Sequence, residues 1–260
     1  MRSWMVCVAS GLTVLACDSD SSGPSERAQE KDSAVEASVE PLPGMNVLAP
    51  GESYGGKSAE EWAKEYVRWF YSPTSCKSAA NDEDGSQCGL YQDPESPVFF
   101  FERAPYSVTS APITTRTLCR VPAGKALVVP IALFALDNVG VDPPLTDGEV
   151  RQAAEEIKRS MRQLFLAADG REIEALEERG VGPAGFSYRV PPAPNFYSCS
   201  QQQDVADTVI EPNYAVGYLA IVEPPTPGKH ELEYSSMVTF SDTHLAYHVK
   251  TSFVVDDANE

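Results

Sequence analysis

One short segment carries the pattern that nucleotide-binding proteins use to hold phosphates. Residues 51–58 read Gly-Glu-Ser-Tyr-Gly-Gly-Lys-Ser, so Lys57 and Ser58 complete the pattern Gly-x4-Gly-Lys-Ser. In such a loop, backbone N–H groups and the lysine hold the phosphates between a strand and a helix. Here Ser58 also opens a Ser-x-x-Glu capping box with Glu61, and the chain lacks repeated strand–helix units. We therefore predict that this segment starts a helix and binds no nucleotide.

The residue types that bind metals are few or poorly spaced. Of the three histidines, His244 and His248 lie on a predicted strand, where four residues span roughly 13 Å, too far for one metal. Residues 81–85 read Asn-Asp-Glu-Asp-Gly, which makes Asp82 and Asp84 weak calcium candidates, but the spacing and the final glutamate of an EF-hand are missing. We expect no cofactor, with calcium as the open alternative.

The acidic residues leave a hydrolase open as the alternative function. Asp137, Asn138, Asp142 and Asp147 form a second acidic loop after a long apolar run. A glycosidase needs two carboxyl groups about 5–10 Å apart, but among 38 acidic residues the sequence nominates no pair, so catalytic residues stay unknown. The motif His-Glu-x-x-His, which marks zinc proteases, does not occur.

The first residues predict export and lipidation. Arg2 precedes an uncharged apolar run at 4–16, which has the length of a signal-peptide core and is too short to span a bilayer. It ends Val-Leu-Ala-Cys, which resembles the bacterial lipobox, so Cys17 is the predicted lipidation site and residues 1–16 the lipoprotein signal peptide. An ordinary signal peptide with a chance cysteine is the alternative. The predicted location is the bacterial cell envelope, extracytoplasmic and lipid-anchored.

The composition separates a tether from a folded domain. Residues 17–44 are rich in Ser, Glu, Asp, Ala and Pro and have almost no large apolar side chain, which is typical of a disordered, acidic tether. With 42% hydrophobic residues overall, residues 45–260 are expected to form a single domain with a sizeable core. The net charge of −18 argues against nucleic acids and anionic lipid headgroups as partners.

Four cysteines remain once Cys7 leaves with the signal peptide and Cys17 is lipidated; they are Cys76, Cys88, Cys119 and Cys199. No Cys-x-x-Cys occurs, so in an exported chain they predict two disulfides. We favour Cys88–Cys119 with Cys76–Cys199, because Cys88 and Cys119 flank a strand-like run at 97–101. The local pairing, Cys76–Cys88 with Cys119–Cys199, stays open.

The hydrophobic pattern predicts a mainly β protein with two helices. Trp62, Tyr66, Trp69 and Phe70 form one face of a helix that ends before Pro73, and a second helix, capped by Thr146 or Asp147, is predicted at about 149–161. Strand-like runs separated by Pro/Gly turns lie at 97–101, 118–121, 125–134, 163–168, 186–190, 217–222, 230–240 and 245–255. The fold predicted is an antiparallel β-sandwich with a packed N-terminal helix and one inserted helix.

Two positions in these runs place special requirements on the backbone. Pro130 lies inside the apolar run at 125–134, and a proline there requires an edge strand or a β-bulge. Asp169-Gly170 is a strong hairpin turn pair, which favours strand, turn and strand after residue 163, although a longer helix remains an alternative.

Several landmarks resemble a known family. They are Trp62 and Trp69, Asn81 with Asp84-Gly85 and Cys88, residues 97–100, Arg116, the stretch Cys-Arg-Val-Pro-Ala-Gly-Lys-Ala at 119–126, Asp169-Gly170, Gly217-Tyr218 and residues 227–230. In order and spacing these resemble a widespread family of exported bacterial proteins of unassigned function, over about residues 58–255. The resemblance implies one secreted β-rich domain and supplies no catalytic residues. This chain departs from it in Cys76, Cys199 and the lipobox.

The function expected from the sequence is non-enzymatic. We expect a lipid-anchored envelope protein that binds a protein or saccharide partner through loops of the sandwich, with its lipid in the membrane. The alternative is an envelope hydrolase that acts on polysaccharide with a carboxylate pair. A cleft with two close acids of perturbed pKa would favour the enzyme, whereas exposed aromatic side chains on a shallow surface would favour binding.

Overall fold

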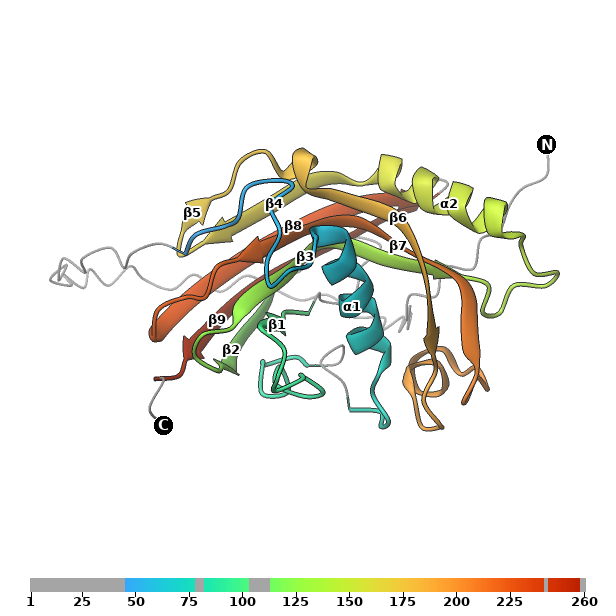
Figure 1. The fold of residues 1–260 in the computed structure, drawn as a ribbon, viewed down its shortest axis with the longest axis horizontal. Helices are drawn as coiled ribbons and strands as arrows, with labels where there is room; N and C mark the ends of the chain where they lie inside the picture. The colour runs from blue at the N-terminus through green and yellow to red at the C-terminus, as the bar shows by residue number, and fades with distance from the viewer. Residues whose placement is uncertain (1–44, 78–81, 103–112, 241–242, 258–260) are drawn as a thin grey trace, which may run out of the picture.

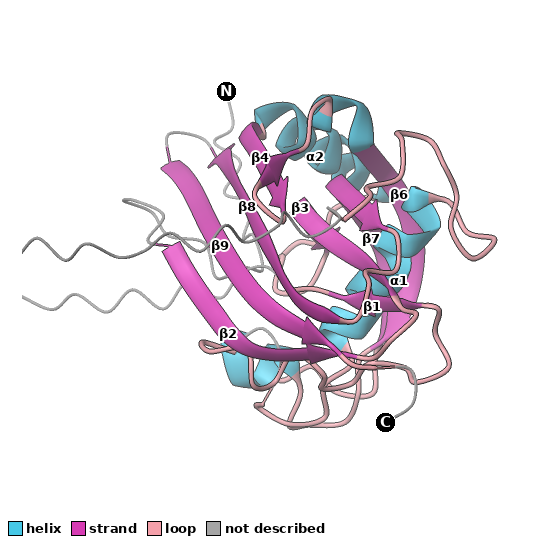
Figure 2. Cartoon of the chain, turned by 90° about the vertical axis from the view of Figure 1, so that its left-hand side faces the viewer, coloured by secondary structure: helices cyan, strands magenta, loops and turns pink. Residues whose placement is uncertain are grey.

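The computed structural model describes residues 45–77, 82–102, 113–240 and 243–257. They form two β-sheets packed face to face, with helix α1 on the outer face of one sheet and helix α2 along one side of the sandwich (Figures 1 and 2). The predicted β-sandwich with a packed N-terminal helix and an inserted helix is confirmed. The segments 1–16 and 17–44, including Cys17, lie outside the described residues.

The first sheet has the strand order β1-β3-β7-β6. Its strands are β1 (Val98–Phe100), β3 (Ala126–Asp137), β7 (Val209–Val222) and β6 (Gly180–Arg189). β3 is apolar along most of its length because it is buried on both faces. Pro130 lies on this central strand, and the register with β7 shifts between Pro130 and Ala132, so the proline is accommodated by a bulge and not by an edge position.

The second sheet has the strand order β2-β9-β8-β4-β5. Its strands are β2 (Ile113–Val121), β9 (Thr243–Val255), β8 (Gly228–Phe240), β4 (Arg162–Ala168) and β5 (Arg171–Glu172). The alternation predicted for β8 is confirmed, because Leu232, Tyr234 and Val238 are buried in the core between the sheets. Asp169 and Gly170 form the turn between β4 and β5, so the strand–turn–strand prediction holds over the longer helix.

Two neighbouring pairs depart from the antiparallel arrangement. β1 pairs with β3 in parallel, and β2 pairs with β9 in parallel, whereas the other pairs between named strands are antiparallel. β1 and β2 are each the edge strand of their sheet and lie at the same side of the sandwich (Figure 2). Alternation of apolar residues gives the buried face of a strand but not its direction, so the sequence did not predict these pairs.

Both helices begin at a capping box. In α1 (Ala59–Tyr71) the Ser58 hydroxyl accepts the Glu61 N–H and the Glu61 carboxylate accepts the Ser58 N–H, and the predicted aromatic stripe is buried on the first sheet. In α2 (Asp147–Ser160) the cap is Thr146, paired with Glu149. α2 buries an apolar stripe into the core between the sheets. No helix in the described ranges is long and apolar enough to cross a membrane.

The two disulfides have the favoured connectivity. Cys76 is joined to Cys199 and Cys88 to Cys119, with Cα–Cα distances of 5.3 and 5.6 Å. The first bond links the segment after α1 to the short helical segment η3 (Tyr197–Gln201), and the second links the loop before β1 to β2. Since disulfides persist in oxidising compartments, they indicate an extracytoplasmic location.

Candidate functional site

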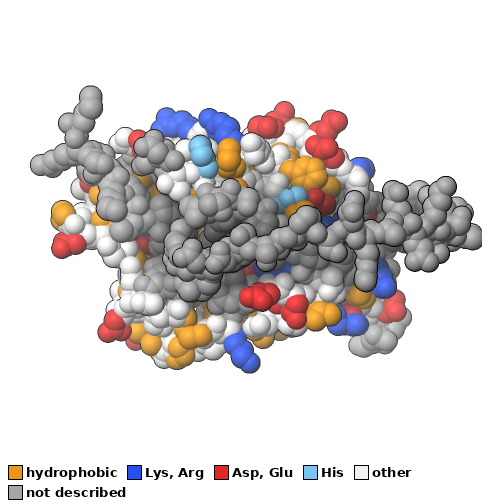
Figure 3. Space-filling view, turned by 180° about the vertical axis from the view of Figure 1, so that it is seen from behind, with side chains coloured by type: hydrophobic (Ala, Val, Ile, Leu, Met, Phe, Trp, Pro, Cys, Tyr) orange, Lys and Arg blue, Asp and Glu red, His pale blue; other side chains and the backbone are white. Residues whose placement is uncertain are grey.

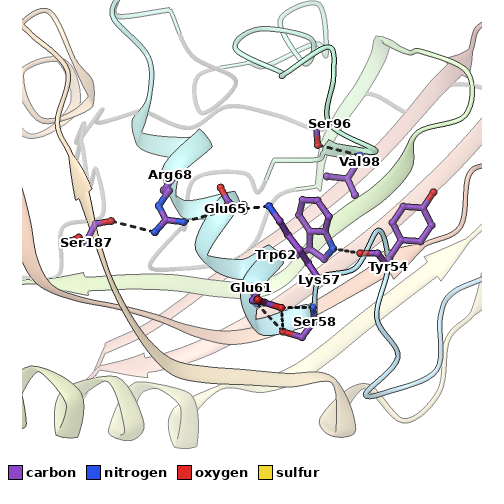
Figure 4. Close-up of polar contacts among 10 residues, drawn as sticks. All are labelled: Tyr54, Lys57, Ser58, Glu61, Trp62, Glu65, Arg68, Ser96, Val98 and Ser187. Atoms are coloured by element: carbon purple, nitrogen blue, oxygen red, sulfur yellow. Dashed lines mark hydrogen bonds and ion pairs between the residues drawn. The ribbon is translucent and has the colours of Figure 1, made fainter.

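The phosphate-loop pattern is used to begin α1. Tyr54 and Lys57 exchange two backbone hydrogen bonds of 3.0 Å, and the Ser58 N–H is taken by the capping box. The Lys57 ammonium lies 3.5 Å from a carboxylate oxygen of Glu65 and 4.7 Å from the ring centroid of Trp62 (Figure 4). The N–H groups of Tyr54, Lys57 and Ser58 and the Lys57 ammonium therefore have partners within the protein.

The two calcium candidates point their oxygens at backbone N–H groups. Asp82 is buried, and its carboxylate accepts the N–H of Gly85 at 3.0 Å and of Gln87 at 3.1 Å, while Asp84 accepts the N–H of Ser86 at 2.9 Å. Burial raises the pKa of Asp82, and this effect exceeds that of the hydrogen bonds from Gln87 and Gly85, which lower the pKa. Within the described ranges, no group of three or more His, Cys, Asp or Glu side chains could hold a metal ion. This geometry closes a turn.

That turn is fixed to the edge of the second sheet. The buried Arg116 of β2 donates from Nε to the Asp82 carbonyl at 2.8 Å and from Nη1 to the Glu102 carbonyl at 2.9 Å. The Asp84 carbonyl accepts the N–H groups of Thr117 and Leu118 at 2.9 and 3.1 Å. The loop therefore occupies hydrogen-bonding groups that an edge strand would otherwise leave open.

The same loop also covers the edge of the first sheet. The Gln92 side chain pairs with Phe100 of β1 as a strand would, because its Oε1 accepts the Phe100 N–H at 3.1 Å and its Nε2 donates to the Phe100 carbonyl at 2.8 Å. We call residues 82–92 the clamp loop. With the bond from Cys88 to Cys119, it connects both edge strands.

Three exposed apolar side chains lie close in sequence to the two cysteines of this disulfide. Leu90 is 36%, Tyr91 38% and Leu118 57% exposed, and each lies within three residues of Cys88 or Cys119. The backbone beneath them is fixed, since the Leu90 carbonyl accepts the Trp69 indole N–H at 3.3 Å. We call Leu90, Tyr91 and Leu118 the disulfide surface. Exposed acidic residues lie on and just beyond the clamp loop: Glu83, Asp84, Asp93 and Glu95.

The histidines lie apart from one another. His230 is buried between the Asp169 carboxylate, 2.9 Å from Nδ1, and the Thr226 carbonyl, 2.7 Å from Nε2. His244 and His248 lie on β9, as predicted, and bond to Thr239 and Glu233 of β8, respectively. Histidine side chains are visible on the face seen in Figure 3, among separate small groups of acidic and basic side chains.

A buried polar cluster surrounds Asp137 at the end of β3. Its carboxylate accepts the Val139 N–H at 2.8 Å and the Tyr197 hydroxyl at 2.9 Å, and Tyr197 is hydrogen-bonded in turn to the Tyr188 hydroxyl. Burial raises the pKa of Asp137 and also raises the pKa of both tyrosines, which keeps the two phenols protonated. Tyr71 stacks on both tyrosine rings, at 5.2 and 5.5 Å.

Asn213 of β7 lies opposite Asp137 in the β3–β7 register and is fully buried. Neither Oδ1 nor Nδ2 of its side chain has a hydrogen-bond partner. The sequence indicated Asp137 as part of an acidic loop but missed Asn213, Tyr188 and Tyr197. They come from three separate elements, and no spacing along the chain connects them.

The described acids with a raised pKa belong to different parts of the fold. Burial raises the pKa of both Asp82 and Asp137, but the two carboxyl groups share no hydrogen-bond partner. Asp82 is fixed to the clamp loop and β2, whereas Asp137 bonds to β6 and η3 through its tyrosines. Asp147, from the same acidic loop, accepts the Tyr214 hydroxyl at 2.8 Å. Each acid stabilises a local turn or contact.

Comparison with protein-family models gave no match, and neither did comparisons with curated proteins and with solved structures. Function must therefore be inferred from the geometry of this chain. Two features stand out: the disulfide surface, which is accessible and rigidly mounted, and the cluster of Asp137 and Asn213, which is buried.

Proposed function

We propose that this protein is a lipid-anchored binding protein of the bacterial cell envelope that holds a protein or saccharide partner at the disulfide surface. The observation that carries the proposal is the exposure of Leu90, Tyr91 and Leu118 around a single disulfide. A loop that is fixed before binding loses little conformational entropy on binding, and tyrosine side chains such as Tyr91 are enriched among the residues that contribute most to an interface.

The charges around the surface favour a partner with basic groups. Residues 82–96 contain five acidic residues, Asp82, Glu83, Asp84, Asp93 and Glu95, and no Lys, Arg or His. All except Asp82 are exposed, and they lie close in sequence to the exposed Leu90 and Tyr91; many interfaces combine an apolar centre with a polar rim. Complementary charges increase the rate of encounter, and like charges exclude acidic partners.

The anchor is proposed from the N-terminal sequence. The lipobox at Val14–Cys17 and the acidic segment that follows would place the folded domain outside the membrane on a flexible tether. The two disulfides agree with that side of the membrane. Replacement of Cys17 by Ser should abolish incorporation of labelled fatty acid and release the protein from the membrane fraction. Unchanged fractionation would contradict the anchor.

The partner is tested by pull-down from detergent-solubilised envelopes with the lipid intact. The bait is the full chain, either wild type or with Leu90, Tyr91 and Leu118 changed to Ser. The matched control is Val209→Ser, because Val209 is 47% exposed on β7 and lies away from the disulfide. We expect the triple variant to lose at least about tenfold in retained partner, since central interface residues contribute about 2 kcal/mol or more each.

The eluate distinguishes the two classes of partner. It is divided into a protein fraction and a polysaccharide fraction, and both are compared between the baits. A component lost only in the triple variant supports the proposal and identifies its class. Equal retention by the triple variant and by Val209→Ser would contradict binding at this surface. Hydrolysis of the retained polysaccharide by the wild-type chain would favour the alternative function, an envelope hydrolase.

A further inference from the structure

Asp137 and Asn213 form a polar cross-strand pair, and we call the space between their side-chain tips the gap. The two residues are opposite each other on β3 and β7, and Ala135 and Ala215, two residues away on each strand, both pack on the α1 side of the sheet. Asp137 and Asn213 therefore project from that same face, with Cβ atoms about 4.5–5.5 Å apart. No hydrogen bond joins them, and both polar atoms of the fully buried Asn213 amide lack a partner.

The charge of Asp137 is also uncompensated. Its hydrogen-bond donors, the Val139 N–H and the Tyr197 hydroxyl, are neutral. Among the described residues, no Lys, Arg or His forms an ion pair with it. A partly buried carboxylate without a counter-charge and a fully buried amide without partners are each unfavourable. Here the two residues are cross-strand neighbours, so a single cation between them would satisfy both.

We propose that Asp137 and the Oδ1 atom of Asn213 are ligands of a monovalent alkali cation, sodium or potassium. Oε1 of Gln203 is also buried without a partner, and the Gln203 amide packs against Gly140, three residues after Asp137. Asp137 itself is partly exposed, which gives the ion a route from solvent.

The ligand set fits a singly charged ion better than calcium. Calcium takes six to eight oxygens, usually with several carboxylates, whereas this gap has one carboxylate and side-chain amides. The calcium candidates from the sequence, Asp82 and Asp84, lie elsewhere, in the turn that is fixed to β2. The competing occupant is an ordered water, which could also satisfy an amide but would leave the charge uncompensated.

The test compares the stability of the full chain in sodium, potassium and choline chloride at equal ionic strength. Choline is too large to enter a buried gap. We expect the thermal midpoint to be higher in sodium or potassium chloride by roughly 3–6 °C when the ion is at about ten times its Kd. Relaxation of ²³Na in solution provides a direct second measurement, because a bound ion relaxes faster than a free one.

Variants locate the site. Asp137→Asn and Asn213→Leu should each lose the ion-specific shift, whereas Asp147→Asn should keep it, because Asp147 belongs to the same loop but bonds to Tyr214. Asn213→Leu should fold at least as well as wild type in choline, since it replaces an unpaired amide by an apolar group of similar shape. Should Asp137→Asn fail to fold, Asn213→Leu and the ²³Na relaxation still decide the question.

Each outcome has a defined meaning. A shift that both site variants abolish and Asp147→Asn retains supports the cation site. Equal midpoints in the three salts would overturn it and leave water as the occupant. A shift retained in Asn213→Leu would also overturn it, because the ion would then bind elsewhere. Stabilisation by calcium but by neither alkali ion would contradict the assignment of a singly charged ion.

Discussion

The hydroxyl of Tyr247 on β9 donates a hydrogen bond of 2.7 Å to the carbonyl of Pro130 on β3, across the interior of the sandwich. The Ile131 carbonyl lies against the same hydroxyl. The bulge at Pro130 interrupts the β3–β7 ladder, and Tyr247 supplies a donor from the opposite sheet. Pro130, which would normally weaken a central strand, is thereby accommodated. The same hydrogen bond links the two sheets.

The first prediction concerns this contact. Tyr247→Phe keeps the buried ring but leaves the carbonyls at the bulge without their donor, so we expect a loss of about 1–3 kcal/mol in the free energy of unfolding. The measurement is chemical denaturation of the purified domain. Tyr218→Phe is the control, since Tyr218 is only partly buried in the same core. If the two variants were equally stable, water would have to donate the hydrogen bond to the carbonyls at the bulge instead.

The second prediction concerns the disulfides. The bonded cysteines are separated by 31 residues in Cys88–Cys119 and by 123 in Cys76–Cys199. On the loop-entropy model, removal by paired Ser substitutions should cost roughly 3.5–4 kcal/mol for the first bond and roughly 5 kcal/mol for the second. Denaturation of each double variant measures this. Non-reducing peptide mapping must recover both bonds, and a dominant Cys76–Cys88 peptide would refute the connectivity.

The third prediction concerns the helix caps. Ser58→Ala and Thr146→Ala each remove a side-chain acceptor for the N–H at the third helical position, so each should cost about 0.5–2 kcal/mol. Thermal denaturation gives the values. Glu61→Ala should also destabilise α1, because Glu61 accepts the Ser58 N–H at 2.8 Å. If neither Ser58→Ala nor Glu61→Ala lowered the stability, the observed start of α1 would be contradicted.

The fourth prediction concerns pH and Asp137. Because burial raises the pKa of this carboxyl, the folded chain holds its proton more tightly than the unfolded chain. The stability that this bound proton contributes is fully present below the pKa of the unfolded chain, about 3.9. It is lost as the pH rises through the higher pKa of the folded chain. In choline chloride, Asp137→Asn should therefore gain stability relative to wild type between acidic and neutral pH. A constant difference across that range would exclude titration of Asp137.

The fifth prediction concerns Lys57. Since its ammonium contacts Glu65 and Trp62 at the helix surface, Lys57→Ala should change stability by no more than about 1 kcal/mol. ATP should not change the thermal midpoint of the wild-type chain. An ATP-dependent rise that disappears in Lys57→Ala would show that residues 51–58 do bind phosphates.

Much of the fold was predictable because its signals are local. The capping boxes at Ser58 and Thr146 are short patterns whose partners lie three residues away, and both start helices in the structure. The strand β3 was predicted from its long apolar run, and Pro130 correctly indicated an irregularity. Strand ends were less well defined. β6 was predicted only at 186–190, because Gly182, Pro183 and Gly185 in its first half have low strand propensity.

The candidate sites were not predictable in the same way. Asn213 and Asp137 are brought together by the register of β3 with β7, and that register depends on where a bulge falls. The disulfide surface depends on Leu118 pointing outward beside Cys119, and β2 has a second irregularity at that point, between Arg116 and Cys119. A single sequence indicates which residues are apolar or charged, but not which distant residues become neighbours.

The clamp loop has a consequence for how this protein reaches its native form. The backbone edges of β1 and β2 are covered by Gln92 and Asp84 only when residues 82–92 are in place, and the bond from Cys88 to Cys119 keeps them there. In a reduced chain the loop is held by hydrogen bonds alone, so these two edges open more readily to strand pairing with other copies. Oxidation after export would therefore act as quality control, since a molecule that misses this one bond is the one prone to polymerise.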